Sequence, residues 1–312
     1  AALLMIGTQA GFTFSGLKDF MASGRELAHA ELIGALLIAG FGTLISLFPF
    51  HSWAAPAYAS APAPVAMMHA GVLKKFGLYG LFMFQPLMET GFLPWTNILL
   101  VLLVCNVIWV GYVTVNQKRL DLLLGNSSVM HMGYIFLAFA ALVVSGSAEA
   151  NPWALKGAAL LMLAHGLTIA LLFLLCGQIE KQTGTLEINS LGGLSTRLPR
   201  MAFVFGLAGM ASIGLPGLAN FPGEFMVFFS GFAGFSNGFG PVQIATILCL
   251  WGLVIGAVYM LRAYRNIFQG DLSKASAYAT GLQPSERAAN CFLVIALAVF
   301  GFFPTLVLQF FS

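Results

Sequence analysis

Apolar runs of membrane-spanning length limit most strongly what this chain can fold into. An α-helix rises about 1.5 Å per residue, so about 20 apolar residues cross the ~30 Å hydrocarbon core of a bilayer. With only 8% charged residues and 59% hydrophobic ones, the 312 residues do not fit a water-facing surface. We therefore expect an all-α integral membrane protein, a helix bundle of about eight full spans. The expected spans are 31–50, 64–85, 96–115, 125–145, 154–177, 199–236, 242–263 and 288–311, with a partial one at 1–12.

The chain begins inside an apolar run, and no charged segment precedes residues 1–11. A signal peptide starts with a positively charged region, so this start does not fit one. We expect the chain to be the later part of a longer protein and to form a single membrane domain over 1–312.

Basic residues are unevenly shared between alternate loops. One set of loops, 116–121, 178–200 and 262–287, holds nine of them, whereas the other side holds Lys18, Arg25 and Lys156. Because positive loops stay in the cytoplasm, we expect the nine-residue side to be cytoplasmic, or to face the matrix in a mitochondrion. The expected location is the bacterial plasma membrane or the mitochondrial inner membrane, and no surface suggests nucleic-acid binding. The nine residues are Lys118, Arg119, Lys181, Arg197, Arg200, Arg262, Arg265, Lys274 and Arg287.

The four cysteines stand alone in apolar runs, without the paired spacing of a metal site. We expect all four to be small core residues, no metal site and no cofactor bound in this chain. The cysteines are Cys105, Cys176, Cys249 and Cys291.

Two neighbouring lysines, Lys74 and Lys75, interrupt the apolar run that starts at Pro64. A lysine near mid-membrane costs on the order of 2.5–3.5 kcal/mol, so a chain that keeps one has a use or a partner for it. Neighbours on a helix project about 100° apart, and we expect them not to face one interior together. Snorkelling to the headgroups is favoured for Lys74 and is the alternative for Lys75, which shares a face with Gly71 and Tyr79.

Three more interior groups are candidates for ion chemistry. His131 and His165 lie inside apolar spans. Each is either a functional group or a core histidine whose hydrogen bonds are satisfied within the protein. The long run 199–236 is interrupted at 214–217 and, we expect, again at Pro222 and Gly223, directly before Glu224. A broken helix with one ionisable residue points to an ion pathway, and a carboxylate facing the headgroups is the alternative. Asn106 is expected to bond another helix.

Several motifs occur in a recognisable order over about residues 44–230: PFHSW, HAGVLKKFGLYG, QKRL, NSSVMHMGY, AHGLTIALLFLLCGQ and GLPGLANFPGEF. Together they resemble the antiporter-like proton-translocating membrane subunits of respiratory complex I, most of all the chain 4 (subunit M) branch. The resemblance implies a fourteen-helix bundle with two inverted five-helix repeats. Residues 1–85 would then end the first repeat, 96–263 would form the second, and 288–312 would be the C-terminal helix.

The resemblance also implies a function. Lys75 matches the central lysine of the family's eighth helix, and Glu224 matches the subunit M glutamate of the broken twelfth helix. We expect Lys75, His165 and Glu224 to form a proton relay in a subunit of NADH:quinone oxidoreductase, with His131, Lys118, His69 and Lys74 as further candidates. NADH, FMN, iron–sulfur clusters and quinone would lie in partner subunits, and antiporter-like neighbours and the lipid bilayer would be the partners.

One departure from the family weakens this expectation. The family's seventh helix carries a lysine two residues before a proline, and here Leu44 and Ser46 stand at those positions. Two alternatives therefore stay open. The chain could belong to a multi-subunit cation/proton antiporter or membrane-bound hydrogenase, or it could be a structural subunit of the membrane arm that does not pump.

Overall fold

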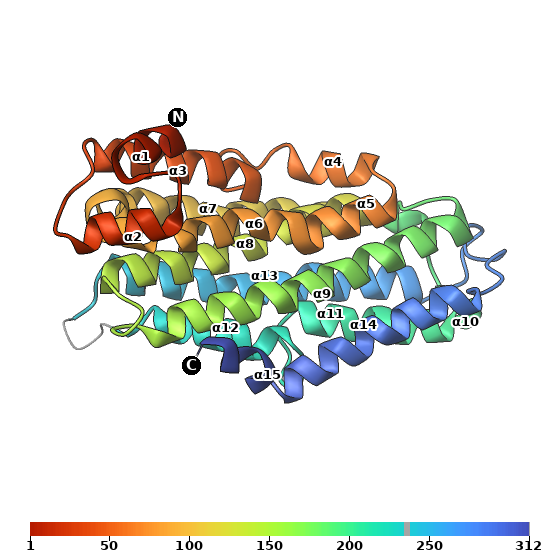
Figure 1. Ribbon diagram of the computed structural model, residues 1–312. Coiled ribbons are helices and arrows are strands. Elements are labelled where there is room, and N and C mark those ends of the chain that lie inside the picture. Colours follow the sequence, from red (N-terminus) through yellow and green to blue (C-terminus); the bar gives the residue numbers. More distant parts are fainter. Residues whose placement is uncertain (234–237, 312) are drawn as a thin grey trace.

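The structure is a computed structural model that describes residues 1–233 and 238–311. In this part of the chain the regular elements are all helices, and the long ones lie nearly parallel in one bundle (Figure 1). Both marked chain ends lie toward the same end of the bundle. This confirms the expected all-α membrane fold.

The elements follow one another in a simple order. The first are α1 (Ala2–Ala10), α2 (Phe14–Ala22), α3 (Ala30–Ile45), α4 (Ala54–Ser60), α5 (Ala63–Met68), a π-helical turn (His69–Leu73) and α6 (Lys74–Met83). Short turns over 85–95 lead to α7 (Thr96–Val115), α8 (Leu120–Ser145), α9 (Pro152–Thr183), α10 (Leu194–Arg197), α11 (Pro199–Ser212), α12 (Asn220–Ser230), α13 (Pro241–Phe268), α14 (Pro284–Phe302) and α15 (Thr305–Leu308).

Five helices in the described ranges are long and apolar enough to cross a membrane. The other expected crossings are shorter or assembled from pieces, so the number of spans stays a prediction. The five are Gln85–Val115, Leu120–Ser145, Pro152–Thr183, Pro241–Phe268 and Pro284–Phe302, and the apolar helix Ala30–Ile45 is shorter.

The long run expected to be interrupted is indeed broken between α11 and α12, over 213–219. The second interruption, expected at Pro222 and Gly223, is wrong, because both residues lie in the first turns of α12. The first four N–H groups of a helix have no intrahelical partner, so a proline is tolerated there. The end of the expected span, 234–236, lies outside the described residues.

Helix α8 is the centre of the bundle. Almost every side chain from Leu120 to Val143 is buried, and α7, α9, α4, α12 and α13 all pack against it. A helix that is hydrophobic all round is one enclosed by others. The few polar groups on α8 therefore lie in the interior.

The lysine-bearing crossing is not one regular α-helix. It begins near Pro64, as expected, but a π-helical turn separates α5 from α6 just before the two lysines. At this turn Gly71 faces Gly166 of α9 so closely that a Cβ on Gly71 would lie 3.2 Å from the Gly166 carbonyl oxygen. Small residues permit such approach between membrane helices. The contact brings the lysine region against α9.

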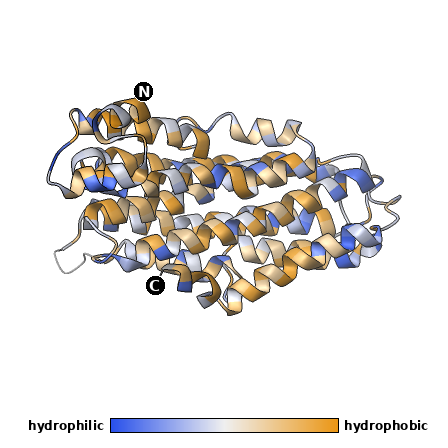
Figure 2. Ribbon diagram, in the orientation of Figure 1, coloured by the Kyte–Doolittle hydropathy of each residue, from blue (hydrophilic) through white to orange (hydrophobic). Residues whose placement is uncertain are grey.

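The three basic loops meet at one end of the bundle. Leu120 N–H donates to the Leu186 carbonyl at 3.0 Å, and Gly193 N–H donates to the Gln269 carbonyl at 3.0 Å. Hydrophilic residues colour this end blue in Figure 2. The expected gathering of the loops is confirmed, and their cytoplasmic sidedness stays a prediction.

The cysteines follow the expectation only in part. Cys176 and Cys249 are buried, but Cys105 is half-buried and Cys291 is exposed. Cys291 lies on α14, whose outer face is apolar and open, so an apolar neighbourhood in sequence does not mean burial within this chain. No sulfur of the four bonds to another among the described residues.

Because the basic loops lie at one end of the bundle, cysteines placed in them should all be labelled from the same face of the membrane. In a cysteine-free background, Ser273→Cys should react with a membrane-impermeant thiol reagent only from the cytoplasmic face. Ser23→Cys, in the loop that carries Arg25, should react only from the other face. The reverse pattern would refute the orientation. Asn237, which the sequence also places on that other face, lies outside the described residues.

Candidate functional site

Lys75 lies in the bundle interior, as the sequence predicted. Its ammonium donates to the carbonyl of Ala70, a carbonyl of the preceding π-helical turn. Gly71, Lys75 and Tyr79 share one face, as expected, and line a groove of about 490 Å³ against α9. The π-helical turn therefore supplies both the close approach to α9 and an acceptor for the lysine.

Lys74 contradicts the sequence-based expectation. It is 0% exposed, so it does not snorkel, and both neighbouring lysines are buried in the same bundle. They are enclosed from two sides. Lys74 Nζ lies 5.8 Å from the ring centre of Tyr58 on α4, whereas Lys75 faces α9. Lys74 Nζ has no hydrogen-bond partner among the described residues.

His69 belongs to the Lys74 side of the helix. Its Nδ1 lies 3.2 Å from the Tyr58 hydroxyl, and its ring meets the Trp53 ring edge-on at 5.5 Å. Lys118 lies elsewhere, exposed at the basic end of the bundle. Lys118 is thus separated from Lys75, whereas His69 stays within electrostatic reach of both lysines.

The two interior histidines lie face to face. The rings of His131 on α8 and His165 on α9 stack with centres 5.0 Å apart and planes 15° apart. His165 Nε2 lies 3.3 Å from the Ser128 hydroxyl, while Nδ1 has no partner in the described part of the chain. Lys75 is close enough to act electrostatically on both rings.

His131 connects this pair to the helix break. Its Nδ1 lies 2.7 Å from the Ser127 carbonyl oxygen, and its Nε2 lies 2.9 Å from the carbonyl oxygen of Ser212, the last residue of α11. A carbonyl only accepts hydrogen bonds, so the ring must carry a hydrogen on both nitrogens to make both bonds. A neutral ring donates to only one of these two carbonyl oxygens at a time.

Glu224 lies just beyond the break, buried on α12. Gly214, with a φ of +78°, packs against its carboxylate so closely that a Cβ there would collide with Oε2. Tyr134 on α8 and Tyr259 on α13 are within electrostatic reach of it, and Oε1 has no partner among the residues described. Within that same part of the chain, Glu224 forms no ion pair with Lys75.

Four of the predicted residues, Lys75, His131, His165 and Glu224, are buried in the interior, and Lys75 acts electrostatically on both histidines. Tyr134 lies between the histidines and the carboxylate, because its ring meets His131 edge-on at 5.6 Å and Glu224 acts on it electrostatically. Sequence reasoning missed several of the polar groups around them. Ser127 bonds Tyr259 at 2.7 Å, and Thr168 donates to Asn220 at 3.0 Å. Asn220, the first residue of α12, stands next to the GLPG break in sequence, which was the signal that could have identified it.

Asn106 bonds between helices, as expected. Its side-chain amide donates to the carbonyls of Ser46 and Val129 at 3.1 and 3.2 Å, and its oxygen accepts from Phe48 N–H at 2.5 Å. It fixes the end of α3 to α7 and α8. Leu44, four residues before Phe48, is 38% exposed and faces Gly77 of α6. Its side chain is apolar, so this position holds no titratable group.

The apolar helices form a bundle around buried ionisable groups, and one helix is broken beside them. This arrangement is that of an integral membrane protein with a polar interior path. The chain belongs to the NADH:quinone oxidoreductase/Mrp antiporter transmembrane family, whose pattern matches residues 1–249. This confirms the resemblance seen in the motifs.

Relatives of known name are similar along nearly the whole chain. The chain is 32% identical to NAD(P)H-quinone oxidoreductase chain 4 1 of Synechococcus sp. (strain JA-2-3B'a(2-13)) over 96% of its length, which covers 56% of the relative. It is 36% identical to chain 4 1 of Synechococcus elongatus over 94% of its length, which covers 53% of that protein. The chain thus spans about half the length of these curated relatives.

A solved structure has the same fold. A chain of respiratory complex I from Thermus thermophilus with bound NADH superposes with a TM-score of 0.86 and 26% identity. The match covers 99% of this chain and 63% of that one. The helix bundle is therefore arranged as in that chain of the complex.

The contact between Gly214 and Glu224 predicts a selective effect. Gly214→Ala should displace the carboxylate and reduce ion translocation several-fold, besides a backbone cost of roughly 1–2 kcal/mol for a side chain in the left-handed region. Gly184→Ala is the matched control, because Gly184 at the end of α9 has a φ of +71° and a Cβ there would meet nothing within 4 Å. The measurement is translocation per assembled complex, and equal losses in the two variants would contradict the role assigned to the contact.

Proposed function

We propose that this chain translocates protons across the membrane as an antiporter-like subunit of NADH:quinone oxidoreductase. The observation that carries the proposal is the buried line from Lys75 through the stacked histidines to the helix break and Glu224. Buried ionisable groups are expensive in a membrane protein, and a row of them at a broken helix marks an ion pathway. Protons are the ions that lysine, histidine and glutamate exchange directly.

Each group in the line holds or passes a proton at a stated atom. Lys75 Nζ offers one site, and His165 Nδ1, which has no protein partner in the described ranges, offers a position for a water or an incoming proton. The stacked His131 ring lies next, bonded to both α8 and α11. Glu224 Oε1 receives or releases a proton beyond the break. Because like charges repel, a proton on one group disfavours a second on its neighbour, and occupancy shifts along the line.

The redox chemistry would take place outside this chain. NADH, FMN, iron–sulfur clusters and quinone are assigned to partner subunits, and the enzyme activity is that of a translocase subunit in the whole complex. Neighbouring antiporter-like subunits would contact its sides, and the basic loops 116–121, 178–200 and 262–287 would face the cytoplasm. Residues 1–85 and 96–263 would correspond to the end of the first repeat and to the second repeat.

One observation favours a second candidate, a structural subunit that completes the membrane arm without pumping. Leu44 stands where the family resemblance implies a lysine, and its partly exposed side chain offers no proton site. A cation/proton antiporter, which shares the family pattern, would differ in needing no NADH for translocation. Both are separated from the proposal by the experiments below.

Removal of charge from the two ends of the line tests the relay. Lys75→Met and Glu224→Gln keep similar volume, and each should leave the complex assembled while proton translocation falls by about tenfold or more, since a titratable group is lost. Glu224→Asp should be milder because it keeps a carboxylate, and His165→Ala should be intermediate. The measurement is quenching of a pH-sensitive dye in vesicles supplied with NADH and quinone, normalised to assembled complex.

Matched controls make the same chemical changes away from the line. Lys156→Met and Glu149→Gln, near the beginning of α9 and in the loop before it, should keep normal quenching. Normal quenching in both Lys75→Met and Glu224→Gln would refute the relay and leave the structural subunit. Translocation that continues without NADH would instead favour an antiporter.

Leu44 gives an independent prediction. If no proton passes through this position, Leu44→Ala should change proton pumping little, because only a partly exposed apolar contact with α6 is trimmed. The same dye assay on assembled complex measures it. A large loss of pumping with intact assembly would show that the position acts through packing and not through a titratable group.

A further inference from the structure

Three arginines gather at the basic end of the bundle, away from the proton line. Arg197, Arg200 and Arg287 line a pocket of about 180 Å³ between the start of α11 and the start of α14. All three are exposed, none forms an ion pair or hydrogen bond with another described residue, and no carboxylate lines the pocket. The pocket is therefore a concentration of positive charge without a protein counter-charge.

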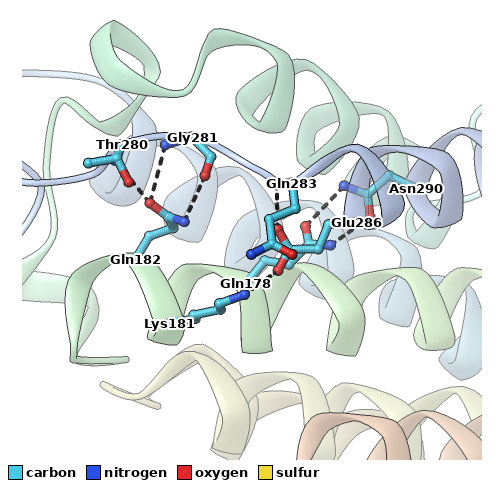
Figure 3. A network of polar contacts seen from close by, with 8 residues as sticks. All are labelled: Gln178, Lys181, Gln182, Thr280, Gly281, Gln283, Glu286 and Asn290. Atoms are coloured by element: carbon cyan, nitrogen blue, oxygen red, sulfur yellow. Dashed lines mark hydrogen bonds and ion pairs between the residues drawn. The ribbon is translucent and has the colours of Figure 1, made fainter.

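The start of α14, which carries Arg287, is held in place by a polar network (Figure 3). The Gln178 and Asn290 side chains exchange hydrogen bonds of 3.1 and 3.0 Å, and Gln182 donates to the Gly281 carbonyl at 2.9 Å. Lys181 pairs with Glu286 at 2.8 Å. Glu286, the residue before Arg287, is thus engaged by Lys181, and the backbone that carries Arg287 is fixed.

An apolar groove runs along the same helices toward mid-membrane. It has a volume of about 580 Å³, lies between α11, α13 and α14, and includes Gly206 and Gly209 on its floor and Ala298 on its α14 side. Helix α11 has 14 residues and is thus about 21 Å long, enough to cover the ~15 Å depth of one leaflet. The groove ends at Leu215, Pro216 and Gly217, in the helix break.

We propose that this pocket and groove form a binding site for an anionic phospholipid. The arginine side chains bind the phosphate and any further negative headgroup, since a guanidinium donates two parallel hydrogen bonds to phosphate oxygens. Basic pockets between helices at the cytoplasmic surface suit such headgroups. One acyl chain lies in the groove along α11, beside the Tyr264 and Met260 side chains that pack near Gly206 and Gly209.

The place where the groove ends gives the site a consequence. The tail of the acyl chain packs against Pro216 and Gly217, in the same break in which Gly214 packs against Glu224. A bound lipid therefore supports the backbone that positions the carboxylate. The lipid site itself stands without the proposed function, because it rests on charge and groove geometry.

A photoactivatable lipid tests the site in the native membrane assembly that holds this chain. Phosphatidylglycerol with a diazirine in its acyl chain should cross-link to peptides of α11 and α14 about tenfold more than the matching phosphatidylcholine, at equal content in vesicles. Arg200→Gln/Arg287→Gln should lower the labelling by a similar factor. Arg265→Gln/Lys274→Gln, which removes two exposed charges from the same end, should not.

A second variant tests the groove separately. Ala298→Phe fills it from the half-buried α14 side and should reduce acyl cross-linking to α11 while the arginines stay intact. Equal labelling by the two lipids, or equal loss in the two double variants, would overturn the proposal. Displacement of the lipid by inorganic phosphate at constant ionic strength would also overturn it, because the pocket would then bind a free anion. A partner protein cross-linked to Ala298 in place of lipid would do the same, because the groove would then be a protein interface. Because labelling is measured without turnover, failure of proton pumping leaves this result unaffected.

Discussion

The hydrogen bond from His131 to the Ser212 carbonyl is the contact on which the interior arrangement depends. Lipid tails offer no hydrogen bonds, so the backbone groups freed at a helix break need partners inside the protein or in a water-filled cavity. His131 on α8 binds the last carbonyl of α11, and Thr168 on α9 binds the side chain of Asn220, which begins α12. The break is thus held by the two central helices, and it can exist only because α8 is enclosed on all sides.

The His131 ring connects two helices. Its nitrogens lie 2.7 and 2.9 Å from the Ser127 and Ser212 carbonyl oxygens, and a carbonyl only accepts hydrogen bonds. A neutral ring therefore donates to one of the two carbonyls, and the tautomer decides whether α8 or the end of α11 receives the hydrogen bond. Ser212 lies two residues before the glycine that packs against Glu224, so the tautomer of this ring bears on the contacts at the break.

The sequence predicted the parts of this site that local chemistry decides. Apolar runs of spanning length identify membrane helices, and the GLPG sequence before Glu224 identified the break, because a proline and two glycines remove helix stability locally. Which groups share the interior depends on packing, and there the sequence failed. Lys74 is buried because α4 covers a side that periodicity treats as open, and the π-helical turn that turns Lys75 toward Ala70 has no residue signature. Tyr134 and Tyr259 matter only because α8 and α13 meet beside Glu224.

Lys74 and Lys75 are buried side by side, and this raises the cost of protonating both at once. Within the described residues neither pairs with a carboxylate, so one protonated ammonium raises the cost of protonating the other. The neighbours are nevertheless chemically distinct. Lys74 lies against Tyr58, whereas Lys75 binds Ala70, and both lysines act electrostatically on His69 and on the histidine pair. A proton on one side of the helix therefore influences groups on the other side without a bond between them. The π-helical turn that precedes both lysines supplies the carbonyl that Lys75 binds, so it fixes where this pair stands in the bundle.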